Sequence, residues 1–329
     1  MARSLVMKAL LLIGGLGTRL RPLTEAVPKQ LIPIAGKPVL YHVFDLLPRD
    51  TPEVVLAMGY RAADIEAYVR AHPPPFPVRS VVESSPLGSG GAMRFAGESV
   101  SDPFYLLNTD VVAQVDLSEL QALHARHRAF GVMGLVEVED TRPYGVAALD
   151  QDRIVRFVEK PAPADAPSHW ANAGVAVWSR AVLDAIPSGR SLSFEQEILP
   201  RLLDRGVYGY RLKGLWEDAG TPARLLHAQR LLFDAGRAES PGRPRGARGS
   251  ARVCCAPSAR VDGVEFGDYV TIGADTRIEA GARIADSTLL EAVTVGKGAT
   301  ITRSIIGPGA TVGAGATLID RVVAARASV

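Results

Sequence analysis

The sequence predicts an α/β fold, a Rossmann-like, mostly parallel sheet, followed by a left-handed parallel β-helix. Short apolar runs alternate with amphipathic segments from residue 7 to about residue 233, and a six-residue repeat follows. Such alternation is typical of a parallel sheet covered by helices on both faces. A fixed period of six with glycine at the turns is typical of a hexapeptide coil. We expect three segments: an α/β domain at 1–234, a basic flexible linker at 235–252 and a β-helix domain at 253–329.

The expected elements of the first segment follow one another closely. Strands are expected at 8–13, 54–58, 78–82 and 104–107, and helices at 38–47 and 62–71. Apolar runs separated by turns then predict an antiparallel or mixed extension of the sheet. These runs lie at 132–138, 146–149, 154–158 and 173–178. Two further helices are expected at 194–203 and 222–233.

The repeat consists of large apolar side chains at a regular spacing. Phe266, Ile272, Ile278, Ile284 and Leu290 are six apart, and the pattern continues to about residue 319 with two five-residue steps. Each of these residues is expected to point into the coil, because a helix would need a period of 3.6. Stacked coils with uncapped ends favour association, so we expect a homo-oligomer formed through this domain. Deleting it is expected to alter assembly or stability and to leave the chemistry largely intact.

Composition narrows the classes of partner. The chain has 37 Lys and Arg against 35 Asp and Glu, which gives no whole-chain reason to expect nucleic-acid binding. No apolar run approaches the ~18 residues of a membrane span. The two cysteines, Cys254 and Cys255, are adjacent, and bridging them would be strained. We therefore expect thiols, a reducing compartment and a cytoplasmic protein.

A glycine-rich turn after the first strand indicates phosphate binding. Gly14, Gly15 and Gly17 allow backbone amides to approach phosphate oxygens closely, and Thr18 follows them. Arg19 adds a forked donor and Lys29 a point charge. Position 20 is Leu where a dinucleotide fingerprint needs Gly, and Gly36-Lys37 is followed by Pro38, so a P-loop also fails.

The turn resembles the hallmark of the sugar-nucleotide pyrophosphorylases, which join a sugar 1-phosphate to a nucleoside monophosphate. Further blocks match that family in order along residues 7 to about 230. They are Glu83 with 86–92, 108–110, 144–146, 159–161, 172–174 and 216–221. The sequence departs from the family at Thr109, where the metal-binding block has Gly. Within the family, the chain looks most similar to mannose-1-phosphate guanylyltransferases with a C-terminal hexapeptide domain, which makes 1–234 the catalytic domain.

The resemblance implies a role for each matching residue. Arg19 and Lys29 would hold the β- and γ-phosphates, and Asp110 and Asp218 would bind Mg²⁺. Lys160 would bind the sugar phosphate, and Glu159, Asn172 and the backbone of Gly145 would contact the sugar. The expected catalytic set is therefore Arg19, Lys29, Asp110, Lys160 and Asp218. The expected nucleotide contacts also include Gly14, Gly15, Gly17, Thr18, Glu83, Gly88 and Gly91.

Glu83 bears on the choice of base. A carboxylate can accept both adjacent donors of guanine, N1–H and the 2-amino group, whereas thymine and uracil present one donor between two carbonyls. Glu83 therefore favours GTP, and the resemblance then implies mannose 1-phosphate as the second substrate. A glucose-1-phosphate thymidylyl- or uridylyltransferase remains an alternative. So does a non-catalytic, regulatory sugar-nucleotide-binding homologue, which Thr109 would favour by crowding the nucleotide.

Overall fold

The computed structural model of the chain describes residues 6–329. The chain divides into two compact units, each made of two separate segments. The first unit comprises 6–15 and Val43–Trp216, and the second comprises Leu16–His42 and Glu217–Val329. The segment 16–42 and the helix after residue 221 therefore belong to one unit with the C-terminal repeats, although the sequence suggests three consecutive domains.

The first unit is built on a nine-stranded sheet with the order β5-β4-β1-β6-β11-β8-β12-β10-β9. Strands β5, β4, β1 and β6 are parallel to one another, and β11 runs antiparallel to both β6 and β8. Strands β9 and β10 form an antiparallel pair at the other edge. The mixed extension is thereby confirmed. The bounds are β1 Ala9–Ile13, β4 Val54–Met58, β5 Val78–Val82, β6 Phe104–Asn108, β8 Gly131–Glu137, β9 Gly145–Asp150, β10 Arg153–Glu159, β11 Trp170–Trp178 and β12 Val207–Arg211.

Helices accompany this sheet. They are α1 Val39–Phe44, which continues from one unit into the other, α2 Ala62–Ala71, α3 Gly88–Ala96 and α4 Leu117–His127. Two of them, α1 and α2, lie where the sequence predicts helices. Helix α3 packs against β1 and β4, and α4 packs against β8, β11 and β12. Strand β7, Val111–Ala113, leads from the end of β6 towards α4. Among residues 6–329, no helix combines the length and hydrophobicity that a membrane crossing requires.

One expected helix is wrong. Residues 194–203 form a π-helical turn at Phe194–Ile198 and two 3-10 turns at Leu199–Arg201 and Leu203–Arg205. Pro200 lies inside this segment and has no backbone N–H for a continued α-helix. The hydroxyl of Ser193 still accepts a hydrogen bond from the backbone N–H of Gln196, which begins the turn.

The second unit contains a small hairpin, one long helix and the C-terminal coil. The hairpin joins β2, Pro33–Ile34, to β3, Lys37–Pro38, through Ala35 and Gly36, both at positive φ. Helix α5, Pro222–Asp234, begins at Thr221, whose hydroxyl accepts the backbone N–H of Arg224. Strand β13, Trp216–Asp218, precedes it. Pro at the first helical position and a threonine cap explain why the helix starts here.

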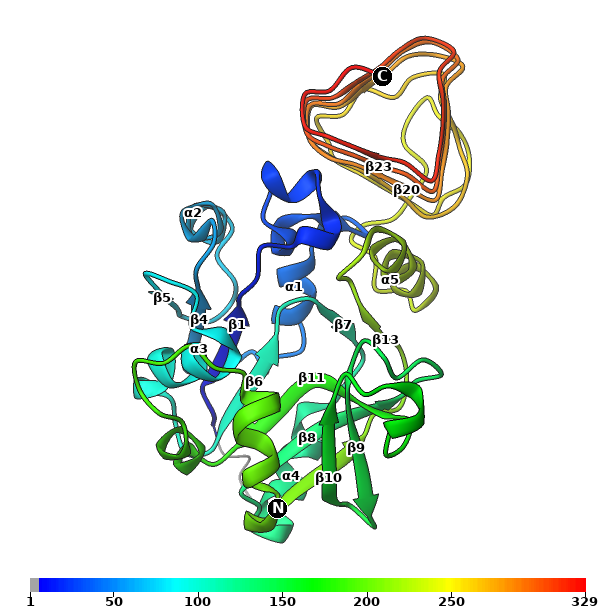
Figure 1. Cartoon of the computed structure of the whole chain (residues 1–329). Coiled ribbons are helices and arrows are strands. Elements are labelled where there is room, and N and C mark those ends of the chain that lie inside the picture. The colour runs from blue at the N-terminus through cyan, green and yellow to red at the C-terminus, as the bar shows by residue number, and fades with distance from the viewer. Residues whose placement is uncertain (1–5) are drawn as a thin grey trace. The chain divides into compact units, whose positions relative to one another are not determined.

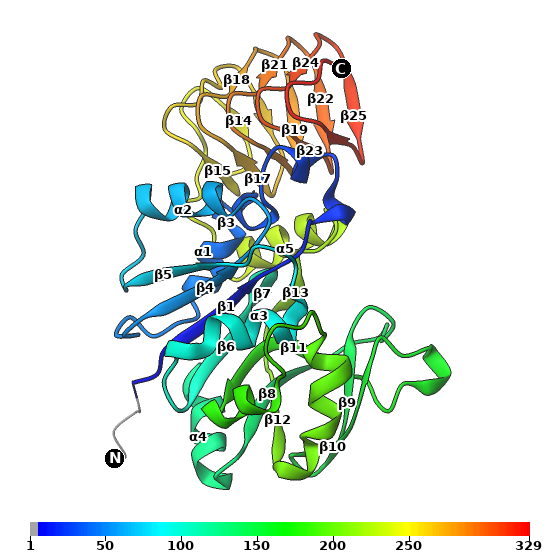
Figure 2. The same cartoon turned by 60° about the vertical axis from the view of Figure 1, so that its left-hand side comes forward.

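The C-terminal coil consists of short parallel strands in three sheets, consistent with a β-helix (Figure 1, Figure 2). Partners in neighbouring coils are 17 or 18 residues apart, as in Phe266↔Ile284 and Ile284↔Ile301. The large apolar residues of the six-residue repeat, from Phe266 to Val312, are buried as expected. The strands are β14 Arg248–Gly249, β15 Val253–Cys255, β16 Glu265–Phe266, β17 Val270–Ile272, β18 Arg277–Ile278, β19 Arg283–Ala285, β20 Ser287–Leu289, β21 Thr294–Val295, β22 Thr300–Thr302, β23 Ile305–Ile306, β24 Thr311–Val312, β25 Thr317–Ile319 and β26 Val322–Val323.

The coil begins earlier and ends later than the repeat. Residues 248–249, expected in the flexible linker, form β14 and pair with β16. Strand β15 pairs with β17, and Ser328 bridges to Thr311 near the chain end. The first and last coils lack the apolar six-residue spacing. They belong to the coil because their backbones hydrogen-bond to a neighbouring coil. The linker boundary at residue 252 is therefore wrong, and the two cysteines are free thiols within β15.

Candidate functional site

The phosphate-binding turn is braced by its own side chains in the second unit. Gly17 adopts φ 60° and precedes the 3-10 turn Thr18–Leu20. The Thr24 hydroxyl donates to the Gly17 carbonyl at 2.9 Å. A Cβ on Gly17 would lie 2.8 Å from Thr24 Cγ2 and 3.5 Å from Lys29 Cβ. Glycine is therefore required at 17 by both conformation and space, and Lys29 lies beside the turn as expected.

Gly14 and Gly15 differ from Gly17. A Cβ on either would meet no atom within 4 Å, although Gly15 has φ +93°. Packing therefore does not explain the glycine at 14. Both positions are exposed, which leaves their backbone accessible to a ligand.

Arg19 and Asp218, far apart in sequence, meet in the second unit. A Cβ on the buried Gly220 would lie 2.5 Å from Arg19 Nη2 and 2.6 Å from Asp218 Oδ1. The guanidinium and the carboxylate thus converge on the same small space, and a side chain at 220 would displace them. The structure therefore joins the glycine-rich turn to the Trp-Glu-Asp block, as the sequence predicts.

Two neighbours of Asp218 were missed by sequence reasoning. Arg224 Nη1 donates to Asp218 Oδ2 at 3.2 Å, and the adjacent Glu217 contacts His227 Nδ1 through Oε2. Only 16% of the Asp218 side chain and 12% of the Glu217 side chain are exposed. Arg224 lies three residues after the Thr221 cap, so the start of α5 holds it against Asp218. The three-residue spacing from the Thr221 cap to Arg224 was the sequence signal that could have revealed this contact.

In the first unit, Asp110 follows the end of β6 and is half-buried. The preceding residue, Thr109, is 2% exposed and its hydroxyl donates to the Leu12 carbonyl at 2.9 Å. The Thr109 side chain thus fills the space between β6 and β1. Its burial removes the crowding that favoured a non-catalytic homologue.

The expected sugar-phosphate residues come together on the β9–β10 pair. Gly145 pairs with Glu159, and a Cβ on Gly145 would lie 2.3 Å from Phe157 Cζ and 2.5 Å from Glu159 Oε2. Lys160 Nζ lies 2.8 Å from Glu159 Oε1. The Lys160 side chain is 61% exposed and Glu159 only 14% exposed, so the ammonium is open to an anion while the carboxylate is held.

Asn172 lies at an irregularity of β11. The register of β11 with β8 shifts between Asn172 and Ala176, and Asn172 Oδ1 accepts the backbone N–H of Gly174 at 3.0 Å. Neighbouring Ala171 pairs with Val146 of β9, which brings Asn172 to the strand that begins at Gly145. The first unit therefore pairs Gly145 with Glu159 and places Asn172 on the adjoining strand β11.

Glu83 follows β5 directly. Its Oε2 accepts the backbone N–H of Leu87 at 3.3 Å. A Cβ on Gly59 would lie 2.9 Å from Glu83 Oε1. Burial raises the pKa of the Glu83 carboxyl, and the Leu87 N–H opposes the shift. One carboxylate oxygen thus contacts its own loop.

The loop after Glu83 is fixed by the segment 190–195. A Cβ on Gly88 would lie 2.4 Å from the Leu192 carbonyl oxygen, and one on Gly91 would lie 2.6 Å from the Arg190 carbonyl oxygen. The Ser89 hydroxyl donates to Glu195 at 2.5 Å and accepts the backbone N–H of Phe194. Close backbone packing therefore accounts for glycine at 88 and 91, and sequence reasoning missed the Ser89–Glu195 contact.

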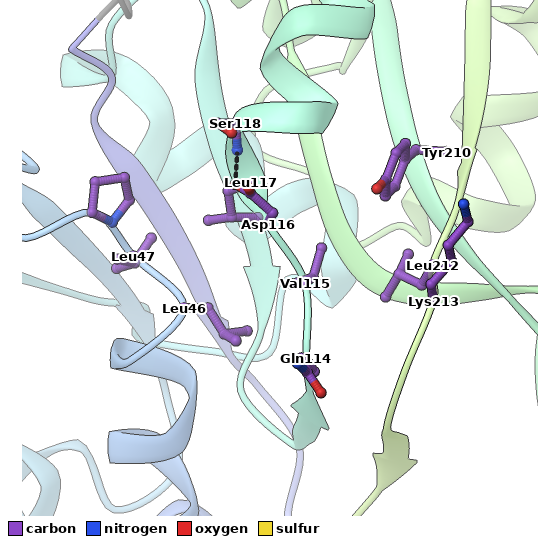
Figure 3. Close-up of a pocket in the computed structure, with 11 residues that line it drawn as sticks. Leu46, Leu47, Gln114, Val115, Asp116, Leu117, Ser118, Tyr210, Leu212 and Lys213 are labelled. Atoms are coloured by element: carbon purple, nitrogen blue, oxygen red, sulfur yellow. Dashed lines mark hydrogen bonds between the residues drawn. The ribbon is translucent and has the colours of Figure 1, made fainter. Parts of the chain in front are cut away.

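A pocket of about 550 Å³ lies elsewhere in the first unit (Figure 3). Leu46, Gln114, Asp116, Tyr210 and Lys213 are among its lining residues. Asp116 caps α4 by accepting the Ser118 N–H. No residue of the expected site lines this pocket.

The donor set suits a hard divalent cation. Asp110 and Asp218 offer carboxylate oxygens, the ligands that such a cation prefers, and substrate phosphates would supply further oxygens. Each carboxylate belongs to a different unit. Among residues 6–329, no three His, Cys, Asp or Glu side chains gather as a metal site. Two carboxylates alone would leave most coordination positions of such a cation to other oxygens.

Comparison with known proteins identifies the family that each part of the chain resembles. A family model described as nucleotidyl transferase matches residues 8–234, and one described as GMPPB C-terminal domain matches 250–329. Mannose-1-phosphate guanylyltransferase of Mycobacterium tuberculosis is 38% identical over 296 residues, 86% of this chain and 81% of the relative. Mannose-1-phosphate guanylyltransferase 1 of Arabidopsis thaliana is 33% identical over 88% of this chain and 83% of its own. The crystal structure of HddC from Yersinia pseudotuberculosis complexed with GMP-PN is 26% identical, with a TM-score of 0.59 over 68% of this chain and 98% of that one.

Proposed function

The chain belongs to the nucleotidyl transferase family, and from that premise we propose that it transfers a guanylyl group from GTP to mannose 1-phosphate. The coarser activity follows from the family and its relatives: the protein is a sugar-1-phosphate nucleotidyltransferase. GTP and mannose 1-phosphate are supported by the names of the relatives and by Glu83, whose carboxylate suits the two donors of guanine. The observation that carries the proposal is the convergence of Arg19 and Asp218 over Gly220.

The reaction needs little acid–base chemistry. A phosphate oxygen of the sugar 1-phosphate attacks the α-phosphorus of the triphosphate. The bond to the bridging oxygen breaks, and pyrophosphate leaves with that electron pair. Both nucleophile and leaving group are already ionised, so the protein contributes positioning and charge neutralisation.

The residue roles follow from charge and exposure. Arg19 and Lys29 neutralise the β- and γ-phosphates, with the amides of Gly14, Gly15, Gly17 and Thr18 facing the same oxygens. Lys160, exposed beside Glu159, holds the phosphate of the sugar. Glu159 accepts hydrogen bonds from the sugar hydroxyls, and the Asn172 amide donates to them. Glu83 reads the base, and Gly88 and Gly91 allow the base loop to pack closely on the segment 190–195.

We further propose Mg²⁺ as the cation, held by Asp110 and Asp218 with phosphate oxygens of the nucleotide. When bound, the ion would neutralise charge on the triphosphate. Arg224 keeps the Asp218 carboxylate in place for that purpose. The proposal also includes a left-handed coil that takes part in a homo-oligomer. It further places the protein in the cytoplasm, without nucleic-acid or membrane partners.

A pyrophosphate-release assay tests the function directly. Five nucleoside triphosphates are crossed with a panel of sugar 1-phosphates, with and without Mg²⁺. The proposal expects GTP with mannose 1-phosphate to give the highest kcat/KM. Preference for dTTP or UTP with glucose 1-phosphate would replace the guanylyl assignment. Absence of release with every pair would contradict the activity itself.

A further inference from the structure

A single buried side chain connects three parts of the second unit. Gln229 of α5 is fully buried, and every hydrogen-bonding group of its amide is used. Oε1 accepts from the Thr271 hydroxyl at 2.6 Å, from the Thr288 hydroxyl at 3.1 Å and from the Ala35 backbone N–H at 3.1 Å. Nε2 donates to the Tyr269 carbonyl at 2.7 Å and to the Ser287 carbonyl at 3.4 Å.

The partners of Gln229 come from two neighbouring coils and from the β2–β3 hairpin. Thr271 belongs to β17 and Thr288 to β20, and both are 2% exposed or less. Ala35 is the left-handed turn residue of the hairpin. An apolar side chain at 229 would leave buried hydroxyls and carbonyls without their partner, which is costly.

The hairpin turn is closely packed on its other sides as well. The Glu239 backbone N–H donates to the Ala35 carbonyl at 2.8 Å. A Cβ on Gly36 would lie 2.8 Å from Glu239 Cβ and 3.0 Å from Cys254 Cβ, in the first coil. The turn is thus seated directly against the C-terminal coil.

The hairpin in turn follows the phosphate-binding residues. Lys29 begins the 3-10 turn Lys29–Leu31, and β2 starts two residues after that turn ends. Gly17, Thr24 and Lys29 are in close contact, as described above. The other end of α5 holds Asp218 through Arg224. The coil therefore reaches both halves of the nucleotide-phosphate site through α5 and the hairpin.

We propose that Gln229 is a positioning residue. Through Gln229, the coil helps to hold the triphosphate-binding residues in place. Helix α5, two neighbouring coils and the β2–β3 hairpin are held together because Gln229 of α5 hydrogen-bonds to both coils and to Ala35 of the hairpin, which follows the Lys29 segment. This replaces the expectation that residues 253–329 can be deleted with the chemistry intact. The kinetic part of the inference rests on the proposed function.

The test compares Gln229→Leu with Asp286→Asn. Asp286 pairs with Arg230 at the same junction of α5 and coil, and this ion pair joins the helix to the coil and not to Ala35. Loss of one buried hydrogen bond is worth about a factor of ten. We expect Gln229→Leu to raise the KM for the nucleoside triphosphate about tenfold. The KM for the sugar 1-phosphate stays unchanged, because Glu159 and Lys160 lie in the other unit. Asp286→Asn should leave both values near those of the wild type.

Amide hydrogen exchange provides a readout that does not depend on activity. We expect the Ala35 amide to exchange about tenfold faster in Gln229→Leu than in Asp286→Asn. If the leucine variant does not fold, Thr271→Val removes one donor to Gln229 while keeping the side-chain volume, and the same two measurements apply. Unchanged exchange at Ala35, or equal rises in the two KM values, would overturn the inference. If the wild-type protein shows no nucleotidyl transfer, the proposed function is overturned. The hydrogen-exchange result at Ala35 then decides the inference about Gln229.

Discussion

Arg19 Nη2 and Asp218 Oδ1 approach the same point from two segments about two hundred residues apart, and the absent side chain of Gly220 leaves that point empty. In the proposed function, the guanidinium would face phosphate oxygens and the carboxylate would face the metal. Gly220 is therefore the position at which the site is most sensitive to an added methyl group.

Gly220→Ala should reduce activity more than stability. The new Cβ would meet the ends of two polar side chains, which can shift and leave the backbone in place. We expect kcat/KM to fall about 100-fold, as for loss of one preorganised charged contact, with little change in Tm. Gly242→Ala is the matched control, because a Cβ there meets no atom within 4 Å. Equal kinetics for the two variants would contradict the role given to Arg19 and Asp218.

Asp218→Asn and Asp110→Asn should each lower Mg²⁺-dependent pyrophosphate release by at least about 100-fold, since each removes a charge from the proposed metal site. Asp234→Asn, at the far end of α5, weakens an exposed pair with Arg252 and an exposed hydrogen bond from the Tyr269 hydroxyl, and serves as control. The comparison uses initial rates over a Mg²⁺ titration. Near-normal turnover in either site variant would refute the metal assignment for that residue.

Glu83 should give nucleotide binding a pH dependence. Because burial raises the pKa of its carboxyl, protonation begins at a higher pH than for an exposed glutamate. The protonated form accepts fewer hydrogen bonds from guanine, so the KM for GTP should rise as the pH falls through that raised pKa. Glu83→Gln should abolish this dependence and weaken GTP use relative to dTTP and UTP. A KM profile that is the same in both proteins would rule out Glu83 as the base-reading group.

Thr109 should matter for stability and not for turnover. Thr109→Val removes the hydroxyl that donates to the Leu12 carbonyl, a buried hydrogen bond worth about 1 kcal/mol. We expect the free energy of unfolding to fall by about that amount, with kcat within twofold of the wild type. Denaturant unfolding and steady-state assays measure the two quantities. A large loss of kcat at unchanged stability would place Thr109 in contact with the nucleotide.

Gly145→Ala should affect the sugar substrate alone. Its Cβ would lie 2.3 Å from Cζ of the buried Phe157 and 2.5 Å from Glu159 Oε2, so the ring and the carboxylate beside Lys160 must both move. We expect the KM for the sugar 1-phosphate to rise about tenfold, and the KM for GTP to stay constant. Parallel changes in both KM values would instead indicate a general disturbance of the β9–β10 pair.

The sequence by itself determined most of the local structure and the identity of the chemical groups. Strands 54–58 and 78–82 and helix 62–71 have the predicted bounds, because apolar periodicity follows directly from which faces are buried. The side chains from Phe266 to Val312 point inward because each coil repeats the same local environment. The glycine-rich turn, Asp110 and Asp218 were found as patterns of residue type.

Only the tertiary structure decided how these groups are held. The orientation of Thr109 depends on β1, almost a hundred residues earlier, and no local pattern carries that contact. Strand β14 exists because the next coil supplies its partner, although its own residues have the composition of a linker. Gln229 has the sequence context of an ordinary helical glutamine, and its importance appears only when Ala35, Thr271 and Thr288 surround it. Local sequence determines which backbone conformation is favourable, whereas long-range hydrogen bonds and packing determine which side chains meet.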